Sequence, residues 1–203
     1  MNSPRQIALL FLILFAGVAA YLYFPRHFYQ EAMANQLASL LSGQPKAIDL
    51  RIKSADCQYN GALPDHACTP GEVFRNATTG QICVSGYTKT VRNVSTKLRK
   101  SVFAEYGLPY PQPYGAYEVD HLIPLALGGD NNIANLFPQP AKPEPGFREK
   151  DVVEIYLHNE VCAGNISLNN AQGEIADNWL EVYNNLTPDQ IALIKSQYKN
   201  WSE

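Results

Sequence analysis

The sequence predicts an α+β protein in which two short strands and a helix form a central strand–strand–helix (ββα) unit with flanking helices. Three observations carry this prediction. Residues 117–139 hold two strand-like stretches separated by a glycine-rich loop. A helical stretch follows at residues 148–160, and two amphipathic stretches complete the C-terminal part. A long apolar stretch at the N-terminus predicts one further helix, of the transmembrane or signal type.

The N-terminal apolar segment determines the predicted compartment. Residues 7–24 carry no charged side chain, and Arg5 is the charged side chain that precedes them. These 18 residues would span about 27 Å as a helix, close to the hydrocarbon thickness of a bilayer. We therefore predict a signal anchor or a cleaved signal peptide at residues 1–25. The rest of the protein would be anchored to the membrane on the periplasmic or extracellular side, or secreted.

Three further parts follow this segment. Residues 26–56 are predicted as a helical spacer or linker, since their apolar side chains recur at helical spacing until a glycine and a proline interrupt them. Residues 57–186 form the predicted domain, and every motif with a candidate catalytic or binding role lies there. Residues 187–203 are predicted as a last helix that packs on this domain.

The two C-terminal helices have clear start signals. The first is predicted to begin near Ser167. The second begins at Thr187, with Pro188 in its first position and Gln190 completing a capping box. Apolar side chains at helical spacing give the first helix one buried face: Ile175, Ala176, Trp179, Leu180 and Tyr183.

Charge is low overall but locally concentrated. The formal net charge of -3 argues against attraction of nucleic acid to the whole surface. Residues 89–100, however, contain five cations and no acid: Lys89, Arg92, Lys97, Arg99 and Lys100. We interpret them as candidate nucleic-acid-binding residues that contact phosphates. The alternative is a solvated helix face, and in either case little sequence preference is expected.

The residues of the central unit resemble a known family. The motif DHLIP at residues 120–124, the glycine pair at 128–129 and Asn-Leu at 135–136 resemble the core pattern of HNH nucleases, the ββα-metal superfamily. The stretches at residues 82–92 and 150–172 make the chain similar to a group of exported bacterial HNH-like proteins. The resemblance covers more than half of the chain.

This resemblance implies a metal-dependent endonuclease that hydrolyses phosphodiester bonds, with DNA favoured over RNA as the substrate. His121 is the candidate general base, because an imidazole is largely neutral near pH 7 and can take a proton from water. Asn135 would tie the glycine loop to the strands and hold His121 in position. Asp120 and His121 are neighbours in a strand, so both reach one site only if the strand bends there.

The cation is expected to be Mg²⁺, with Mn²⁺, Ni²⁺ or Zn²⁺ as alternatives. Asp120 offers a hard oxygen ligand. The resemblance places a second ligand three residues before a lysine, where this chain has Phe147. Glu154 is the candidate substitute and His158 the next one. Lys150 is a candidate catalytic contact to substrate phosphate, or else forms a solvated helical pair with Glu154.

Four cysteines allow three disulfide connectivities. We favour a pairing of Cys83 with Cys162, which would fasten the helix at residues 148–160 to the upstream segment. Cys57 and Cys68 would then close a short loop. Disulfides suit an exported protein.

A second function class stays open. Because the expected helix ligand is missing, the chain could be a catalytically inactive HNH-like module that binds nucleic acid or a partner protein outside the cytoplasm.

Overall fold

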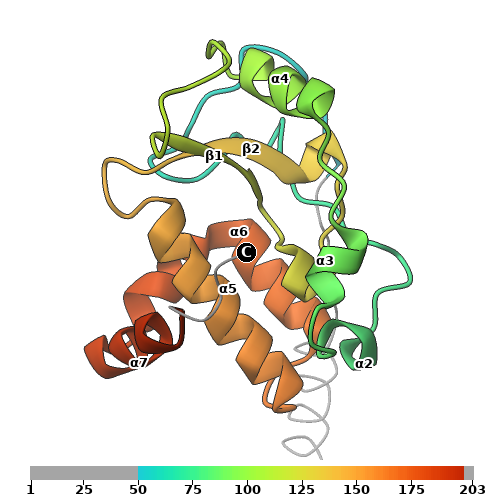
Figure 1. Cartoon of the computed structure of the whole chain (residues 1–203), viewed down its shortest axis with the longest axis vertical. Coiled ribbons are helices and arrows are strands. Elements are labelled where there is room, and N and C mark those ends of the chain that lie inside the picture. Colours follow the sequence, from blue (N-terminus) through green and yellow to red (C-terminus); the bar gives the residue numbers. More distant parts are fainter. Residues whose placement is uncertain (1–49, 199–203) are drawn as a thin grey trace, which may run out of the picture. The chain divides into compact units, whose positions relative to one another are not determined.

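The computed structural model describes residues 50–198, with Tyr198 described in its backbone alone. These residues form a mixed α+β fold with one two-stranded sheet and several helices (Figure 1). The predicted signal segment at residues 1–25 and most of the predicted spacer at residues 26–56 lie outside the described residues. Between residues 50 and 198, the structure contains no helix with the length and apolar character of a membrane span.

The sheet is an antiparallel pair of strands, β1 (Tyr117–His121) and β2 (Leu136–Pro140). His121 lies opposite Leu136 at the end of this pair. The ladder ends at this pair. Beyond it, the Asn135 side chain takes the place of a strand partner, because its amide bonds to the backbone of the residues that follow β1.

Glycines allow the loop between the strands to return close to β1. Gly128 adopts a φ of +76°, in the left-handed region that favours glycine. A Cβ atom on Gly129 would lie 1.8 Å from the carbonyl oxygen of Ile123, so no side chain fits there. Two short 3-10 turns, η1 (Leu125–Leu127) and η2 (Ile133–Asn135), complete the loop.

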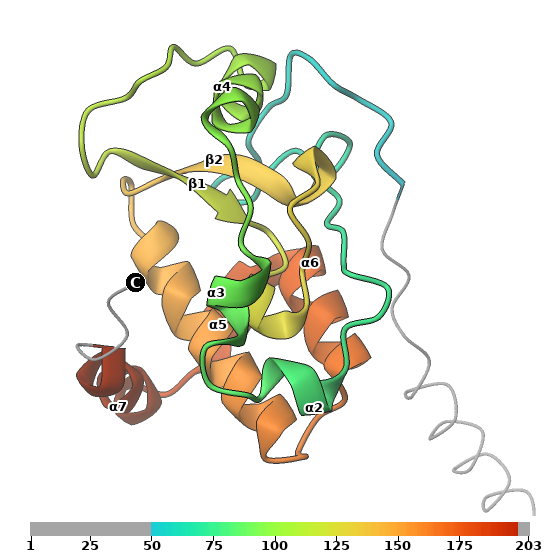
Figure 2. The ribbon, with the colours of Figure 1, turned by 45° about the vertical axis from the view of Figure 1, so that its right-hand side comes forward.

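Helices cover both faces of the sheet (Figures 1 and 2). Helix α4 (Thr96–Glu105) lies on one side, and α5 (Phe147–Cys162) and α6 (Leu168–Asn185) lie on the other. The core between these elements includes Leu157 and Trp179, whose side chains are fully buried. Burial of each such side chain stabilises the fold by about 1.5–3 kcal/mol.

The C-terminal helices begin where the sequence predicted. The Ser167 hydroxyl accepts the backbone N–H of Asn170 at 3.1 Å and caps α6. Helix α7 (Pro188–Tyr198) starts with the expected capping box. The Thr187 N–H donates to Gln190 Oε1 at 2.8 Å, and the Gln190 N–H donates to Thr187 Oγ1 at 3.3 Å.

The basic stretch forms parts of two helices instead of one. A short helix α2 (Thr79–Ile82) comes first, and α3 (Tyr87–Val91) follows it. The chain then turns, and the Ser95 hydroxyl caps α4 by accepting the Leu98 N–H at 3.2 Å. This break places Lys89 on α3 and Lys97, Arg99 and Lys100 on α4, which the sequence pattern did not predict.

The two disulfides have the predicted connectivity. Cys57 pairs with Cys68 at a Cα–Cα distance of 6.1 Å, and Cys83 pairs with Cys162 at 5.7 Å. The second disulfide fastens the end of α5 to the residue that follows α2. Because disulfides form and persist in oxidising compartments, they support a location outside the cytoplasm.

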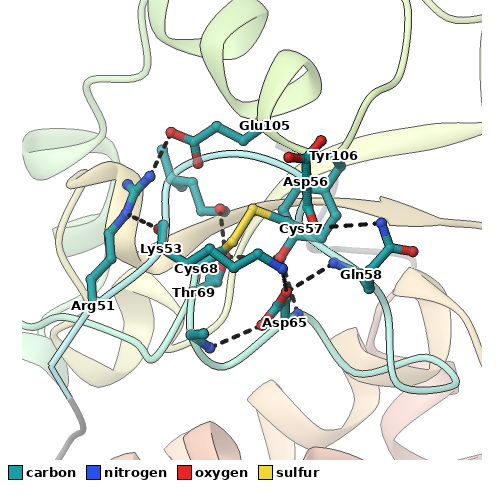
Figure 3. Close-up of a disulfide and its surroundings, with 12 residues drawn as sticks. Arg51, Lys53, Asp56, Cys57, Gln58, Asp65, Cys68, Thr69, Glu105 and Tyr106 are labelled. Atoms are coloured by element: carbon teal, nitrogen blue, oxygen red, sulfur yellow. Dashed lines mark hydrogen bonds and ion pairs between the residues drawn. A yellow bond between two sulfur atoms is a disulfide. The ribbon is translucent and has the colours of Figure 1, made fainter.

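Polar contacts surround the first disulfide (Figure 3). The Asp65 carboxylate accepts the backbone N–H groups of Gln58 at 2.9 Å and Ala67 at 3.0 Å. It also accepts the Lys53 ammonium at 2.9 Å. The short loop closed by the disulfide is therefore stabilised by a network of its own.

Candidate active site

An open cleft of about 860 Å³ runs along β1, between α4 and the N-terminal half of α5. Every residue of β1 contributes to its wall, and residues 110–115 form part of its rim. Acidic and basic side chains line it together. The acidic ones are Glu118, Asp120, Glu149, Asp151 and Glu154, and the basic ones are Arg92, Arg99, Arg148 and Lys195.

His121 lies in the wall of this cleft with 3% of its surface exposed. Its Nε2 atom is 3.2 Å from Oδ1 of Asn131. The Asn131 amide is oriented by two further bonds, since its Nδ2 donates to the Val91 carbonyl at 2.8 Å and its Oδ1 accepts the Asn93 N–H at 3.0 Å. Because Oδ1 can only accept, Nε2 of His121 carries the proton. The lone pair of the ring therefore lies on Nδ1.

The His121 ring is neutral at pH 7. Burial lowers its pKa to about 4. The Asp120 carboxylate and the Asn131 amide oppose this shift, whereas the positive charges of Arg92 and Lys150 add to it. A neutral imidazole whose Nδ1 is unprotonated can accept a proton from water.

One lysine holds two carboxylates of the cleft wall. Lys150 of α5 is fully buried, and its Nζ donates to Asp120 Oδ2 at 2.9 Å, to the His121 carbonyl at 2.7 Å and to Glu154 Oε1 at 2.5 Å. These three bonds use all three ammonium hydrogens. The side chains of Asp120 and Glu154 remain 16% and 18% exposed, and both line the cleft.

Two carboxyl groups share one ammonium in this cluster. Burial alone would lower the pKa of Lys150, but Asp120 and Glu154 outweigh it and raise that pKa. Burial raises the pKa of Glu154 to about 8, and the charges of Asp120 and Asp151 add to the rise against the opposing effect of Lys150. Glu154 is therefore largely protonated at pH 7, and a cation such as Mg²⁺, which prefers hard oxygen donors, would have to displace its proton.

Asn135 makes the loop-ordering contacts that were expected of it. Its fully buried side chain donates from Nδ2 to the carbonyl groups of Ile123 and Asp130, each at 2.9 Å. Its Oδ1 accepts the Ile123 N–H at 2.9 Å. The amide therefore ties the glycine loop to the residues that directly follow His121.

The structure corrects the predicted contact between Lys150 and substrate phosphate. The ammonium is fully buried and already engaged by three acceptors, so it cannot reach a phosphate in the cleft. The alternative, a solvated pair with Glu154, is also wrong. That pair exists, but it lies inside the protein because β1 covers this face of α5.

His158 does not join the two carboxylates, so its predicted role as a ligand beside them is wrong. Its Nε2 lies 3.1 Å from the Ile82 carbonyl and 3.5 Å from Cys162 Sγ, at the disulfide end of α5. Within residues 50–198, its ring nitrogen groups with the two sulfurs of that disulfide and not with Asp120 or Glu154. Since the sulfurs are bonded to each other, they offer no thiolate to a metal ion.

The cleft divides the predicted nucleic-acid-binding residues. Arg92 and Arg99 line it, whereas the lysines of the same stretch are absent from its wall: Lys89, Lys97 and Lys100. Arg99 lies on the same helix, α4, as Lys97 and Lys100, so the division follows the face that each side chain occupies and not the break between α3 and α4. The two arginines stay candidates for phosphate contact.

Sequence reasoning missed Asn131, which bonds to the His121 ring, and three residues that line the cleft. Asn131 had a signal, because an asparagine in the glycine loop beside a candidate base is a plausible partner for the ring. Arg148 adds a cation at the start of α5. Tyr110 and Tyr114 stand on the proline-rich rim, and the Tyr114 side chain is fully exposed. Two tyrosines in a proline-rich stretch were a weak signal for an aromatic rim.

No family model, no curated protein and no solved structure matches this chain. What the site does is therefore inferred from the chemistry of its own residues.

Proposed function

We propose that this protein is a metal-dependent endonuclease of the HNH, or ββα-metal, type that hydrolyses phosphodiester bonds of nucleic acid, with DNA favoured over RNA. One observation carries the proposal. The neutral His121 ring has its tautomer fixed by Asn131 and lies beside a carboxylate pair in an open cleft. The order of β1, glycine loop, β2 and α5 supports it, because this is the order that the sequence resemblance implies.

His121 would act as the general base. Its Nδ1 takes a proton from a water molecule, whose oxygen bonds to phosphorus while the bond from phosphorus to the departing sugar oxygen breaks. The bond from Nε2–H to Asn131 keeps the ring oriented and stabilises the imidazolium that forms. Asn135 contributes by holding the backbone next to the base.

The residues present fit a hard divalent cation. Asp120 and Glu154 are oxygen donors on the cleft wall, and once Glu154 has lost its proton they exceed the charge of Lys150 by one. We propose Mg²⁺, with Mn²⁺, Ni²⁺ or Zn²⁺ as alternatives. When bound, such a cation stabilises the charge on the phosphate and on the departing oxygen.

The walls of the cleft offer contacts for the rest of the substrate. Arg92, Arg99 and Arg148 can each bind a backbone phosphate. The exposed rings of Tyr110 and Tyr114 can stack on unpaired bases, which is tolerant of sequence. Because phosphate contacts and stacking do not read base edges, we expect little sequence preference.

The test is a cleavage assay with the full-length protein, disulfides intact, on plasmid DNA and on RNA in the presence of Mg²⁺, Mn²⁺, Ni²⁺ or Zn²⁺. We expect wild-type protein to cleave, and His121→Ala to cleave about 10²–10⁴-fold more slowly. His66→Ala is the matched control, since His66 is not part of the cleft wall. Intact DNA and RNA after incubation with wild-type protein and each of the four metals would overturn the proposal.

A second candidate function has its own supporting observation. Phe147 is buried at the start of α5, where the resemblance places a metal ligand, and the Lys150 ammonium lies between the two carboxylates. A catalytically inactive module that binds nucleic acid or a partner protein would tolerate both features. It predicts a shift of labelled DNA in a binding assay under the same conditions, with no cleavage.

A further inference from the structure

We infer that Lys150 is a positioning residue for the cation of the proposed site. Its buried ammonium holds one oxygen of Asp120 and one oxygen of Glu154, and thereby determines how the rest of each carboxylate is presented to the cleft. The inference rests on the proposed function, because it assigns a role within that same site.

The geometry around Lys150 permits a single arrangement. Its three acceptors come from a side chain of β1, from the β1 backbone and from a side chain of α5, all within 2.9 Å. An ammonium whose three hydrogens are bonded to three acceptors has no hydrogen left for a further partner. Because apolar residues in place of a buried ion pair are often at least as stabilising, stability alone does not account for this cluster.

Lys150 also binds the last two residues of β1. In a regular strand, the side chains of Asp120 and His121 would point to opposite sides. Lys150 binds the carboxylate of the first residue and the carbonyl of the second, while the His121 ring is held by Asn131 on the opposite side of the loop. Both residues consequently line one cleft, although they are neighbours in the chain.

Oxygen atoms remain for a cation after Lys150 is bound. Within the described residues, Glu154 Oε2 makes no hydrogen bond, and Asp120 Oδ1 accepts only the backbone N–H of His121, at 2.8 Å. Neither carboxylate can turn away from the cleft without losing its bond to the buried ammonium. Partners that orient metal ligands in this way typically change metal affinity by about 10–100-fold.

The direct test is a crystal of the wild-type protein soaked in Mn²⁺, with the ion located by anomalous scattering. We expect Mn²⁺ on oxygens of Asp120 and Glu154, with the Lys150 ammonium still bound to both carboxylates. An ion that displaces the ammonium, or one bound elsewhere in the cleft, would overturn the inference.

A second test measures Mn²⁺ affinity by titration calorimetry. We expect Lys150→Met to weaken binding by about 10–100-fold. Lys195→Met is the matched control, since Lys195 lines the same cleft but is half exposed and lies 3.7 Å from Glu149, away from the cluster. Wild-type affinity in a folded Lys150→Met protein, checked by circular dichroism, would overturn the inference. If that variant does not fold, the soaked wild-type crystal decides.

Neither measurement involves nucleic acid, so the two proposals can fail separately. Mn²⁺ bound as described, in a protein that cleaves nothing, would support the role of Lys150 and remove the nuclease. If the protein cleaves nucleic acid but the Lys150 ammonium leaves the carboxylates when Mn²⁺ binds, the nuclease proposal is supported and the role of Lys150 is overturned.

Discussion

Two regions of this protein each contain a lysine–carboxylate ion pair in different surroundings. Beside the Cys57–Cys68 disulfide, Lys53 is 37% exposed and pairs with Asp65 at 2.9 Å (Figure 3). Next to β1, Lys150 is fully buried and pairs with two carboxylates. The first pair connects residues 12 positions apart, whereas Lys150 and Asp120 are 30 positions apart.

The two regions also differ in how their charges are satisfied. Burial alone would raise the pKa of Asp65, but hydrogen bonds from Gln58, Lys53 and Ala67 outweigh it and lower that pKa. At the cleft, burial raises the pKa of Glu154, and the charges of Asp120 and Asp151 add to this rise against the opposing effect of Lys150. An ion pair is therefore not by itself a sign of function. Two carboxyl groups that share one buried ammonium beside an open cleft are the feature that distinguishes the candidate site.

The largest expected difference between the two regions is the loss of unfolding free energy when the lysine of each is removed. Lys150→Met leaves two buried carboxylates without a partner, which typically costs about 3–5 kcal/mol of unfolding free energy. Lys53→Met removes an exposed pair worth less than about 1 kcal/mol. Urea denaturation of both variants measures the two losses of unfolding free energy. Equal losses would show that the buried and the exposed ion pair do not differ in their contribution to stability.

As the pH falls, the stability contribution of His121 at the cleft should change before that of Asp65 beside the disulfide. The pKa of His121 is about 4 in the folded protein. In the unfolded chain its pKa is about 6.5, so the unfolded chain binds more protons than the folded protein between these two values. As the pH falls through this range, burial of His121 therefore lowers the unfolding free energy by up to about 3 kcal/mol. Asp65 has a lowered pKa, so its contribution is complete above the ordinary aspartate value and is lost only as the pH falls below it.

The measurement is urea denaturation at a series of pH values from 8 to about 3, where both groups titrate. His121→Ala should flatten the profile between about pH 6.5 and 4, whereas His66→Ala should keep the wild-type slope there. An unchanged slope in His121→Ala would show that burial of the neutral ring does not control acid stability.

The two disulfides extend the comparison from charge to chain connectivity. Cys57 and Cys68 are separated by 11 positions, and Cys83 and Cys162 by 79. Because the entropy of loop closure grows with loop length, loss of the longer disulfide should cost about 2 kcal/mol more. Thermal unfolding of the two double cysteine-to-serine variants gives this difference. A greater loss for the shorter disulfide would mean that local strain or packing dominates.

The smallest expected effect belongs to the network beside the shorter disulfide. Asp65→Asn keeps the shape of the side chain but weakens its hydrogen bonds, at a cost of about 1 kcal/mol. Nucleic acid cleavage should be unchanged, because Asp65 is not part of the cleft wall. A loss of cleavage comparable to that of Asp120→Asn would show that the two regions are coupled.

Local patterns in the sequence predicted much of the fold. Alternating side chains and the glycine pair predicted the strand–loop–strand order, and Ser167 and Thr187 marked helix starts that the structure confirms. The favoured cysteine pairing is also confirmed. These features depend on contacts between residues close in the chain, or on a few cysteines with few possible partners, so a single sequence is informative about them.

Other features were determined only by tertiary structure. Helical spacing shows that Lys150 and Glu154 share one face of α5, but not whether water or a strand covers that face. The structure places β1 there, which turns an expected solvated pair into a buried cluster with Asp120. Likewise, the tautomer of His121 depends on an amide that is itself oriented by residues about 40 positions away. Burial and long-range hydrogen bonds arise from how distant segments pack, and no local pattern records that.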